Sequence, residues 1–289
     1  MNKAKFGFLS AMAVFGTVGL FVKFIPLSSA TVACLRGAMG LLVLLLVMLL
    51  SRKKLDITAI RQNLFLLLLS GAAIGGNWIL LFEAFRLTGV ATGTICYYMA
   101  PVFLVLSSPL LGERLAPKKL ILCGTALLGM VFVSGVLSGG ETNFVGIACG
   151  VGAAALYASV MFMNKKFGVI GANDKTIVQL AAASAVILPY CLLTGGFGLV
   201  GMTGAGWAHL LVVGVIHTGF SYWLYFGTMA KLSSQTVALF SYLDPVIAII
   251  LSAVLLDDPF GWQGIVGAVL ILGSALCSEI PLQKFAKKG

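Results

Sequence analysis

The sequence predicts an all-α membrane protein with ten transmembrane helices in two inverted five-helix repeats. Of its 289 residues, 60% are apolar and only 10% are charged, whereas a soluble domain carries about 25% charged residues. The mean hydropathy is +1.07. Apolar stretches of the roughly 20 residues needed to cross a bilayer follow one another along the chain. This pattern excludes disorder, a coiled coil, a secreted disulfide scaffold and an ordinary soluble enzyme.

In the first half, charged residues or glycine and proline divide the apolar residues into five stretches, at 6–24, 30–50, 63–86, 90–111 and 120–138. The second half repeats this arrangement, at 144–164, 176–195, 206–229, 234–255 and 263–280. The strands of a membrane barrel would alternate apolar and polar residues, and these stretches do not. Since hydrocarbon cannot hydrate peptide groups, we expect ten helices.

The first stretch also resembles a signal peptide. Lys3 and Lys5 precede it, and Ser28-Ser29-Ala30 follows it like a cleavage site. The apolar run is longer than in a typical signal peptide, and it has a counterpart in the second half. We therefore expect it to remain as a helix.

The basic residues predict the orientation. With the N-terminus in the cytoplasm, all of the 19 lysines and arginines except Lys23, Arg36 and Arg86 fall in inner segments. Short cytoplasmic loops carry this excess of positive charge. We expect both termini to be cytoplasmic in a multi-pass protein of the plasma (inner) membrane, and we attribute the net charge of +10 to these loops rather than to nucleic-acid binding.

The cysteines give no sign of a metal site or a disulfide framework. All six lie inside apolar stretches without CxxC spacing, and the chain has only two histidines. Free cysteine behaves as a small buried apolar residue. We expect no metal and no cofactor.

An internal duplication relates the two halves. Shifted by 144 residues, helices 3–5 align with helices 8–10 without a gap, and Tyr98-x-x-Pro101-Val102 falls on Tyr242-x-x-Pro245-Val246. The sequence therefore predicts two repeats, 1–143 and 144–289. An odd number of helices per repeat turns the second copy upside down. Inverted repeats are typical of secondary transporters, whose solute site lies near the membrane midplane.

Pro101 and Pro245 fall at the centres of the fourth and ninth stretches. Proline cannot donate a backbone hydrogen bond, so the carbonyls of Tyr97 and Ser241 are predicted to be free. Matched breaks in two repeats predict hinges or a broken-helix site at Pro101 and Pro245.

Asp244 lies beside Pro245, where a charge costs on the order of 3 kcal/mol. We predict that it faces a polar cavity, as a partner for a substrate ammonium, as a proton carrier, or as both. Arg36 lies within the second stretch, and Glu83 and Arg86 lie at the outer end of the third. For Arg36 and Glu83 the alternatives are a role in coupling or a structural ion-pair network with Arg86.

Aromatic and polar side chains occupy the same depth and could line a cavity for a small amphipathic solute. We predict that the substrate-binding residues, together with Asp244, are Trp78, Phe82, Tyr97, Tyr98, Tyr157, His217, Tyr222 and Tyr242. Packing between helices is the alternative for some of them. His217 could titrate near neutral pH or form a hydrogen bond between helices.

Taken together, these residues resemble the drug/metabolite transporter superfamily, EamA-type. The resemblance covers both halves and rests on Pro101-Val102, Gly112-Glu113 and Gly129 in the first, and on Leu243-Asp244-Pro245-Val246, Asp257-Asp258-Pro259, Gln263, Gly267 and Gly273 in the second. Asp244 and Asp257 replace an expected glutamate, and Cys123 replaces the glycine that matches Gly267. These departures weaken the transfer of any specific coupling role.

The resemblance implies a plasma-membrane carrier, commonly an exporter of amino acids or other metabolites. It also implies a cavity built by helices 1–4 and 6–9, with helices 5 and 10 peripheral and sometimes at a dimer contact. We therefore predict a secondary active transporter, monomeric or homodimeric, that exports small metabolites by alternating access, with a proton as the candidate coupling ion.

Three alternatives remain open. The first is a broad-specificity drug efflux pump and the second is a non-transporting membrane scaffold. The third is an intramembrane enzyme, for which the clustered carboxylates or histidines of acid–base or metal chemistry are missing. We do not expect an enzyme.

Overall fold

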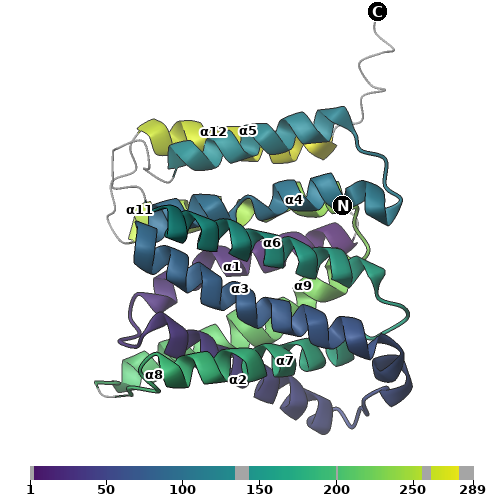
Figure 1. Cartoon of the computed structure of the whole chain (residues 1–289), viewed down its shortest axis with the longest axis vertical. Coiled ribbons are helices and arrows are strands. Elements are labelled where there is room, and N and C mark those ends of the chain that lie inside the picture. The colour runs from purple at the N-terminus through teal and green to yellow at the C-terminus, as the bar shows by residue number, and fades with distance from the viewer. Residues whose placement is uncertain (1–2, 134–142, 200, 256–261, 280–289) are drawn as a thin grey trace, which may run out of the picture.

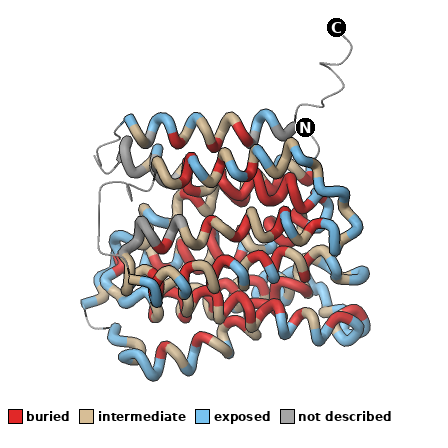
Figure 2. Tube along the Cα trace, turned by 45° about the horizontal axis from the view of Figure 1, so that its top comes forward, coloured by how far each residue is buried: buried red, intermediate tan, exposed pale blue. Residues whose placement is uncertain are grey.

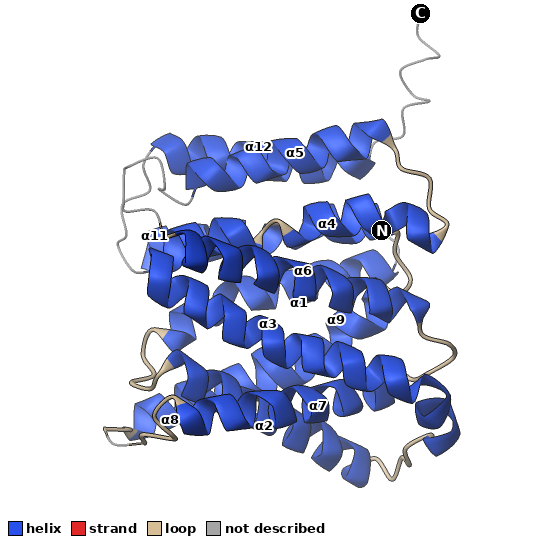
Figure 3. Ribbon diagram, viewed as in Figure 1, coloured by secondary structure: helices blue, strands red, loops and turns tan. Residues whose placement is uncertain are grey.

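The computed structural model describes residues 3–133, 143–199, 201–255 and 262–279, and all regular structure in these residues is helical (Figure 3). The helices of the first half are α1 (Lys3–Val22), α2 (Ser29–Leu50), α3 (Ile57–Tyr97), α4 (Ala100–Ser107), the 3-10 helix η1 (Ser108–Leu111) and α5 (Pro117–Val133). The second half contains α6 (Phe144–Lys166), α7 (Ala172–Leu193), α8 (Gly204–Val212), the π-helix η3 (Val213–Phe220), α9 (Ser221–Met229), α10 (Ser234–Ser241), α11 (Leu243–Leu255) and α12 (Trp262–Glu279).

Polar residues at the predicted boundaries start several helices. Ser28, Asn143, Thr203 and Ser233 cap α2, α6, α8 and α10, each accepting a hydrogen bond from the backbone N–H three residues later. Such caps satisfy donors that a helix leaves free in its first turn. The ends of the helices are therefore fixed by local chemistry at the breaks between apolar stretches.

Within the described residues, six helices are long and apolar enough to cross a membrane: 3–22, 29–50, 57–88, 144–166, 172–193 and 204–229. The other four predicted stretches are also helical where the structure describes them. Two of these are interrupted, at 98–99 and at 242, and two correspond to α5 and α12. The fold is thus the all-α membrane architecture that the sequence predicts.

Helix α3 covers the third predicted stretch and the start of the fourth, because helical backbone continues through the turn between them. A Cβ placed on Gly93 would lie 2.6 Å from Cδ1 of Phe85. Eight residues of straight helix span about 12 Å, so the chain must double back between these residues. The absence of a side chain at Gly93 allows the two arms of this turn to approach.

The helices pack in pairs that match under the 144-residue shift. Helix α3 packs on α6 and α7, while α1 packs on α9 and α2 on η3; α4 packs on α6, and α1 packs on α11. The pairs α2–α7 and α5–α12 each join equivalent elements of the two halves. This arrangement is a twofold relation between inverted copies. The exact boundary at 143/144 remains a prediction.

Helices α5 and α12 form a layer at one end of the long axis (Figure 1). They touch where Gly129 faces α12, since a Cβ there would lie 2.8 Å from the carbonyl oxygen of Gly267. The buried residues concentrate in the remaining helices, and exposed residues line the outside of the bundle (Figure 2). The core that could hold a site therefore lies between α1–α4 and α6–α11.

The links 51–56, 112–116, 167–171 and 230–233 lie at one end of the helices, on the right in Figure 1. We call this the basic end, because these links and the adjoining helix ends hold Arg52, Lys53, Lys54, Arg114, Lys165, Lys166 and Lys231. The links 23–28 and 194–203 lie at the opposite end. The short basic loops thus gather on one side, as a single orientation in a membrane requires.

Candidate functional site

A cavity of about 150 Å³ lies among helices of both halves, and we call it the central cavity. Helices α1, α2, α3, α6, η3, α9 and α11 all contribute to its wall. Its lining residues are Phe15, Val18, Arg36, Trp78, Leu81, Tyr97, Tyr157, His217, Tyr222 and Asp244. The cavity therefore combines one carboxylate and one guanidinium with a largely aromatic wall.

A second cavity of about 30 Å³ shares Tyr97, Tyr157 and Asp244 with the central cavity. Its other lining residues are Met12, Tyr98, Ala100, Pro101 and Ser241. It is large enough for a water molecule, which needs about 10–15 Å³ of such space. The shared residues make it an extension of the central cavity toward the helix breaks.

Two broken helices meet at this extension. Helix α3 ends at Tyr97 and α4 begins at Ala100; helix α10 ends at Ser241 and α11 begins at Leu243. Pro101 and Pro245 stand in the first turns of α4 and α11, where a missing N–H breaks no helical bond, and both are buried. The breaks lie beside the predicted prolines, and their movement as hinges remains a prediction.

Asp244 lies in the first turn of α11, where the helix dipole favours a negative charge. Tyr98 lines the same extension of the cavity as Asp244. Helix α1 packs against this turn at Gly16, where a Cβ would lie only 2.7 Å from the carbonyl oxygen of Asp244. The glycine and the helix break together place the carboxylate on the cavity.

Arg36 reaches the same cavity from α2. Its guanidinium carbon lies 4.3 Å from the centre of the Trp78 ring, a distance typical of a cation–π contact. Among the described residues it forms no ion pair, and its buried Nε has no hydrogen-bond partner. A partly buried guanidinium without an anion is costly, so this group is available to an anionic part of a solute.

His217 lies in the π-helix η3. Its Nε2 is 2.8 Å from the hydroxyl of Thr17, and its Nδ1 is 3.3 Å from the carbonyl oxygen of Val212. The partner five residues back reflects the wider π-helical turn, and π-helical turns are frequent at functional sites. His217 thus lines the cavity and also connects η3 to α1.

Aromatic contacts fix the rest of the wall. The rings of Tyr97 and Tyr157 stack with centres 5.4 Å apart, and Trp78 meets Tyr222 edge to face at 6.3 Å. The hydroxyl of Tyr157 donates a hydrogen bond of 2.9 Å to that of Tyr225. These rings support one another, so the wall is largely formed before any solute binds.

The chain matches the EamA-like transporter family twice, over residues 2–135 and 144–279. These two matches cover nearly the whole sequence. The protein belongs to the EamA-like transporter family.

The relatives of this EamA-like transporter include two that are named uncharacterized transporters and one that is named Protein PecM. Uncharacterized transporter YxxF of Bacillus subtilis is 27% identical over 84% of this chain and 79% of its own. An uncharacterized transporter of Archaeoglobus fulgidus is 27% identical over 93% of both chains. Protein PecM of Dickeya dadantii is 26% identical over 77% of this chain and 75% of its own. A solved crystal structure also matches with a TM-score of 0.86 at 18% identity over the full length of both chains, which supports the fold alone.

The transporter structure brings most of the predicted site residues together. Trp78, Tyr97, Tyr157, His217, Tyr222, Asp244 and Arg36 line the central cavity, and Tyr98 and Pro101 line its extension. Four other predicted residues line neither cavity: Phe82, Glu83, Tyr242 and Pro245. Asp257, Asp258 and Pro259 lie outside the described residues.

Glu83 belongs to a separate polar cluster. Its Oε2 accepts hydrogen bonds from Arg86 at 2.9 and 2.6 Å, and its Oε1 accepts one of 2.5 Å from Tyr190 on α7. Arg36 is not part of this cluster. Of the two sequence-based alternatives, Glu83 thus matches the structural ion pair, whereas Arg36 faces the central cavity.

The contribution of α1 to the two cavities was not predicted from the sequence. Met12, Phe15 and Val18 recur every three residues and line the two cavities, but this spacing also fits ordinary helix packing. The hydrogen bond between Thr17 and His217 was not predicted from the sequence either. A polar residue among Met12, Phe15 and Val18 would have indicated that this face of α1 lines a site.

A second polar network lies at the basic end. The carboxylate of Glu113 accepts hydrogen bonds from the backbone N–H of Ser234 at 2.9 Å and from its hydroxyl at 2.8 Å. Lys165 lies 3.8 Å from Glu113 and also donates to the carbonyl oxygen of Leu232. These bonds tie the link after η1 to the start of α10, and thus the first half to the second.

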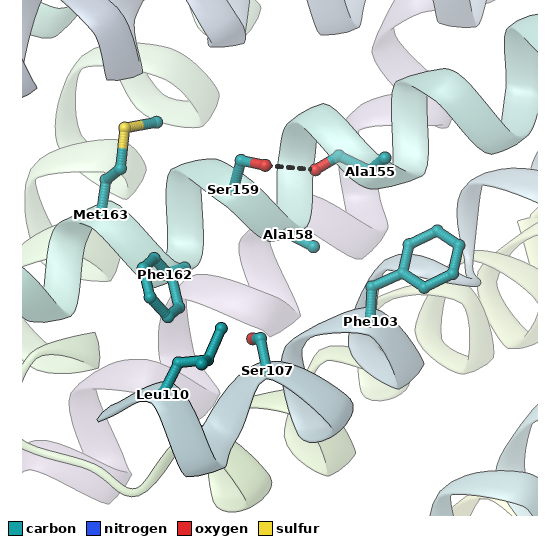
Figure 4. A pocket seen from close by; sticks show the side chains of 8 residues that line it. All are labelled: Phe103, Ser107, Leu110, Ala155, Ala158, Ser159, Phe162 and Met163. Atoms are coloured by element: carbon teal, nitrogen blue, oxygen red, sulfur yellow. Dashed lines mark hydrogen bonds between the residues drawn. The ribbon is translucent and has the colours of Figure 1, made fainter. Parts of the chain in front are cut away.

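A larger groove of about 510 Å³ lies between α4 and α6 (Figure 4). Its polar side chains are Ser107 and Ser159, whose hydroxyls donate to the carbonyls of Leu104 and Ala155 on their own helices. None of the described residues that line it is charged. The smaller central cavity, with Asp244 and Arg36, is therefore the better candidate for recognising a solute.

Proposed function

We propose that the protein is a secondary active transporter that exports small zwitterionic metabolites, such as amino acids with apolar or aromatic side chains, across the plasma membrane. One observation carries this proposal: Asp244 and Arg36 line one cavity with an aromatic wall between helices of both halves. A carboxylate suits the ammonium group of such a solute, and a guanidinium suits its carboxylate.

The remaining lining residues fit an amphipathic solute. Trp78, Tyr97, Tyr157 and Tyr222 offer large apolar faces, with hydroxyl or indole groups at their edges. Small-molecule sites commonly combine such apolar walls with a few polar groups that fix orientation. In this proposal Asp244 and Arg36 orient the solute, while the rings hold its side chain.

Transport follows from alternating access. In our proposal the halves 1–143 and 144–289 rock about the central cavity, and the helix breaks at Pro101 and Pro245 bend. In our proposal, the buried side chains of Phe8, Tyr225 and Phe226 and the Glu113 network close this conformation toward the basic end. We propose that the basic end faces the cytoplasm, so that release occurs at the opposite end.

Uptake into proteoliposomes tests the solute class. Labelled phenylalanine is the probe, with phenylethylamine and phenylpropionate as competitors that each lack one charge. We expect transport of phenylalanine and at least tenfold weaker competition by either analogue, since leaving a buried charge unpaired costs about 2–5 kcal/mol and 1.4 kcal/mol is a factor of ten.

Two variants test which residue binds the ammonium group of the solute and which binds its carboxylate. Asp244→Asn should remove the discrimination against phenylpropionate, and Arg36→Gln should remove that against phenylethylamine. Lys118→Gln, at the start of peripheral α5, is the control and should change neither. Competition by structurally unrelated cations that persists in Arg36→Gln would favour a broad-specificity efflux pump, and no flux of any solute would favour a scaffold.

A further inference from the structure

Apart from the cavities described above, a cavity of about 400 Å³ lies on the outside of the bundle between α2 and the η3–α9 segment. We call it the α2–α9 groove. It shares no lining residue with the central cavity. Leu44 forms its buried floor, whereas Val47, Ile216, Phe220 and Trp223 on its rim are between 37% and 51% exposed. An apolar molecule could therefore enter the groove from the surrounding membrane.

A close helix contact creates this groove. A Cβ on Gly40 would lie 2.9 Å from Cγ2 of Thr218 and 3.0 Å from the backbone nitrogen of Gly219. Small residues allow helices to approach at such a point. The groove begins at Val43, directly after this contact, and continues to Ser51. Eight residues of helix correspond to about 12 Å, which gives a slot rather than a shallow depression.

The two ends of the groove differ in chemistry. Along its length it is lined by apolar residues, but at the basic end it is lined by Ser51, Lys53 and Asn173. Arg52, at a φ of 51°, terminates α2 and turns the chain there, and all of residues 51–54 are exposed. The nearby Asp56 is engaged in capping α3 through the backbone N–H of Ala59. The end of the groove is therefore cationic.

We propose that the α2–α9 groove is a binding site for an anionic phospholipid. One acyl chain lies along Val47, Ile216 and Phe220, and the phosphate lies at Lys53 and Ser51. The charge complementarity supports this occupant, since a lysine and two hydrogen-bonding side chains stand where an acyl chain would meet its headgroup. A neutral phospholipid would leave the cationic end of the groove without an anion.

Native mass spectrometry of the purified full-length protein tests the proposal. Phosphatidylglycerol and phosphatidylcholine with identical acyl chains are added at equal concentration. We expect at least a fivefold excess of retained phosphatidylglycerol. Lys53→Gln should reduce this excess to near one, whereas Lys53→Arg should keep it. Equal retention of both lipids by the wild-type protein would overturn the proposal.

Two further variants separate headgroup from chain. Lys118→Gln should leave the preference unchanged, because α5 lies far from α2 along the long axis of the molecule (Figure 1). An equal loss in this control would show general charge attraction and overturn the site. Ile216→Trp, which fills the slot, should lower the retention of both lipids severalfold. Unchanged retention in Ile216→Trp would place the lipid elsewhere.

Discussion

The hydroxyl of Tyr242 donates a hydrogen bond of 3.1 Å to the backbone carbonyl of Tyr98, and the two rings stack with centres 6.0 Å apart. These residues are equivalents under the 144-residue shift between the halves. Each also lies at the break of its helix, between α3 and α4 or between α10 and α11. One repeat thus supplies a donor for a backbone acceptor that the break leaves outside a helix in the other.

Replacing Tyr242 by Phe should destabilise the contact between the halves. The carbonyl of Tyr98 is buried and would lose this partner, which costs about 1 kcal/mol. We expect a lower thermal midpoint for Tyr242→Phe in detergent. Tyr98→Phe is the matched control, because its backbone carbonyl and the Tyr242 bond are kept; it should weaken solute binding more than stability. Equal midpoints for wild type and Tyr242→Phe would show that the bond adds little.

Gly16 provides a second test of the cavity geometry. A Cβ at this position would lie 2.7 Å from both the carbonyl oxygen of Asp244 and Cβ of Ile247, so Gly16→Ala must push α1 away from α11. Overpacking of this kind costs about 1–3 kcal/mol. We expect lower stability and a severalfold weaker solute affinity, measured by thermal unfolding and binding.

Gly19, one turn further along α1, has nothing within 4 Å of its added Cβ. Gly19→Ala should therefore be neutral, or stabilising by up to about 1 kcal/mol through helix propensity. If both alanine variants behaved alike, the close approach at Gly16 would have no consequence for Asp244.

The helices and their breaks were predictable from the sequence, because their causes are local. Apolar length fixes a span, and Pro101 and Pro245 fix where a helix is interrupted. Asp244 and Arg36 stood out because a charge within an apolar stretch requires a partner or a cavity. The free-energy cost of a charge within an apolar stretch thus identified the charged residues that line the central cavity.

Which aromatic side chains line the cavity was not predictable from their depth in the membrane alone. Tyr222 lines the cavity, whereas Phe82, predicted on the same grounds, packs against the core. Both occupy apolar stretches, and a ring that faces a cavity looks the same in sequence as one that faces another helix. The π-helix at 213–220 was missed for a related reason, since an i to i−5 hydrogen bond has no residue signature of its own.

Contacts between distant links were also beyond the sequence. Glu113 appeared only as part of a Gly-Glu pair after the fourth stretch, yet it binds Ser234, 121 residues away. Nothing in either segment specifies the other. Such a contact follows from the inverted packing of the halves, which brings the end of η1 beside the start of α10.

The Glu113 network should hold the basic end closed. Glu113→Ala removes the hydrogen bonds to the backbone and hydroxyl of Ser234, and losing a helix cap of this kind costs about 1 kcal/mol. We expect faster amide hydrogen exchange in α10 and a shift of the protein toward conformations open at the basic end. Glu83→Ala, which removes the carboxylate paired with Arg86, should leave exchange in α10 unchanged. Equal exchange in wild type and Glu113→Ala would exclude this role.

Asp244 should also decide whether protons drive transport. It is the carboxylate on the central cavity, so it could bind either the ammonium group of the solute or a proton, but not both at once. Competition of this kind couples solute transport to proton transport, because a proton taken up in one conformation displaces the solute. We expect uptake into proteoliposomes to follow an imposed pH gradient in the wild-type protein. Asp244→Asn, which keeps the shape of the side chain, should abolish that dependence while still exchanging solute across the membrane. Gradient-driven accumulation that persists in Asp244→Asn would assign coupling to another group.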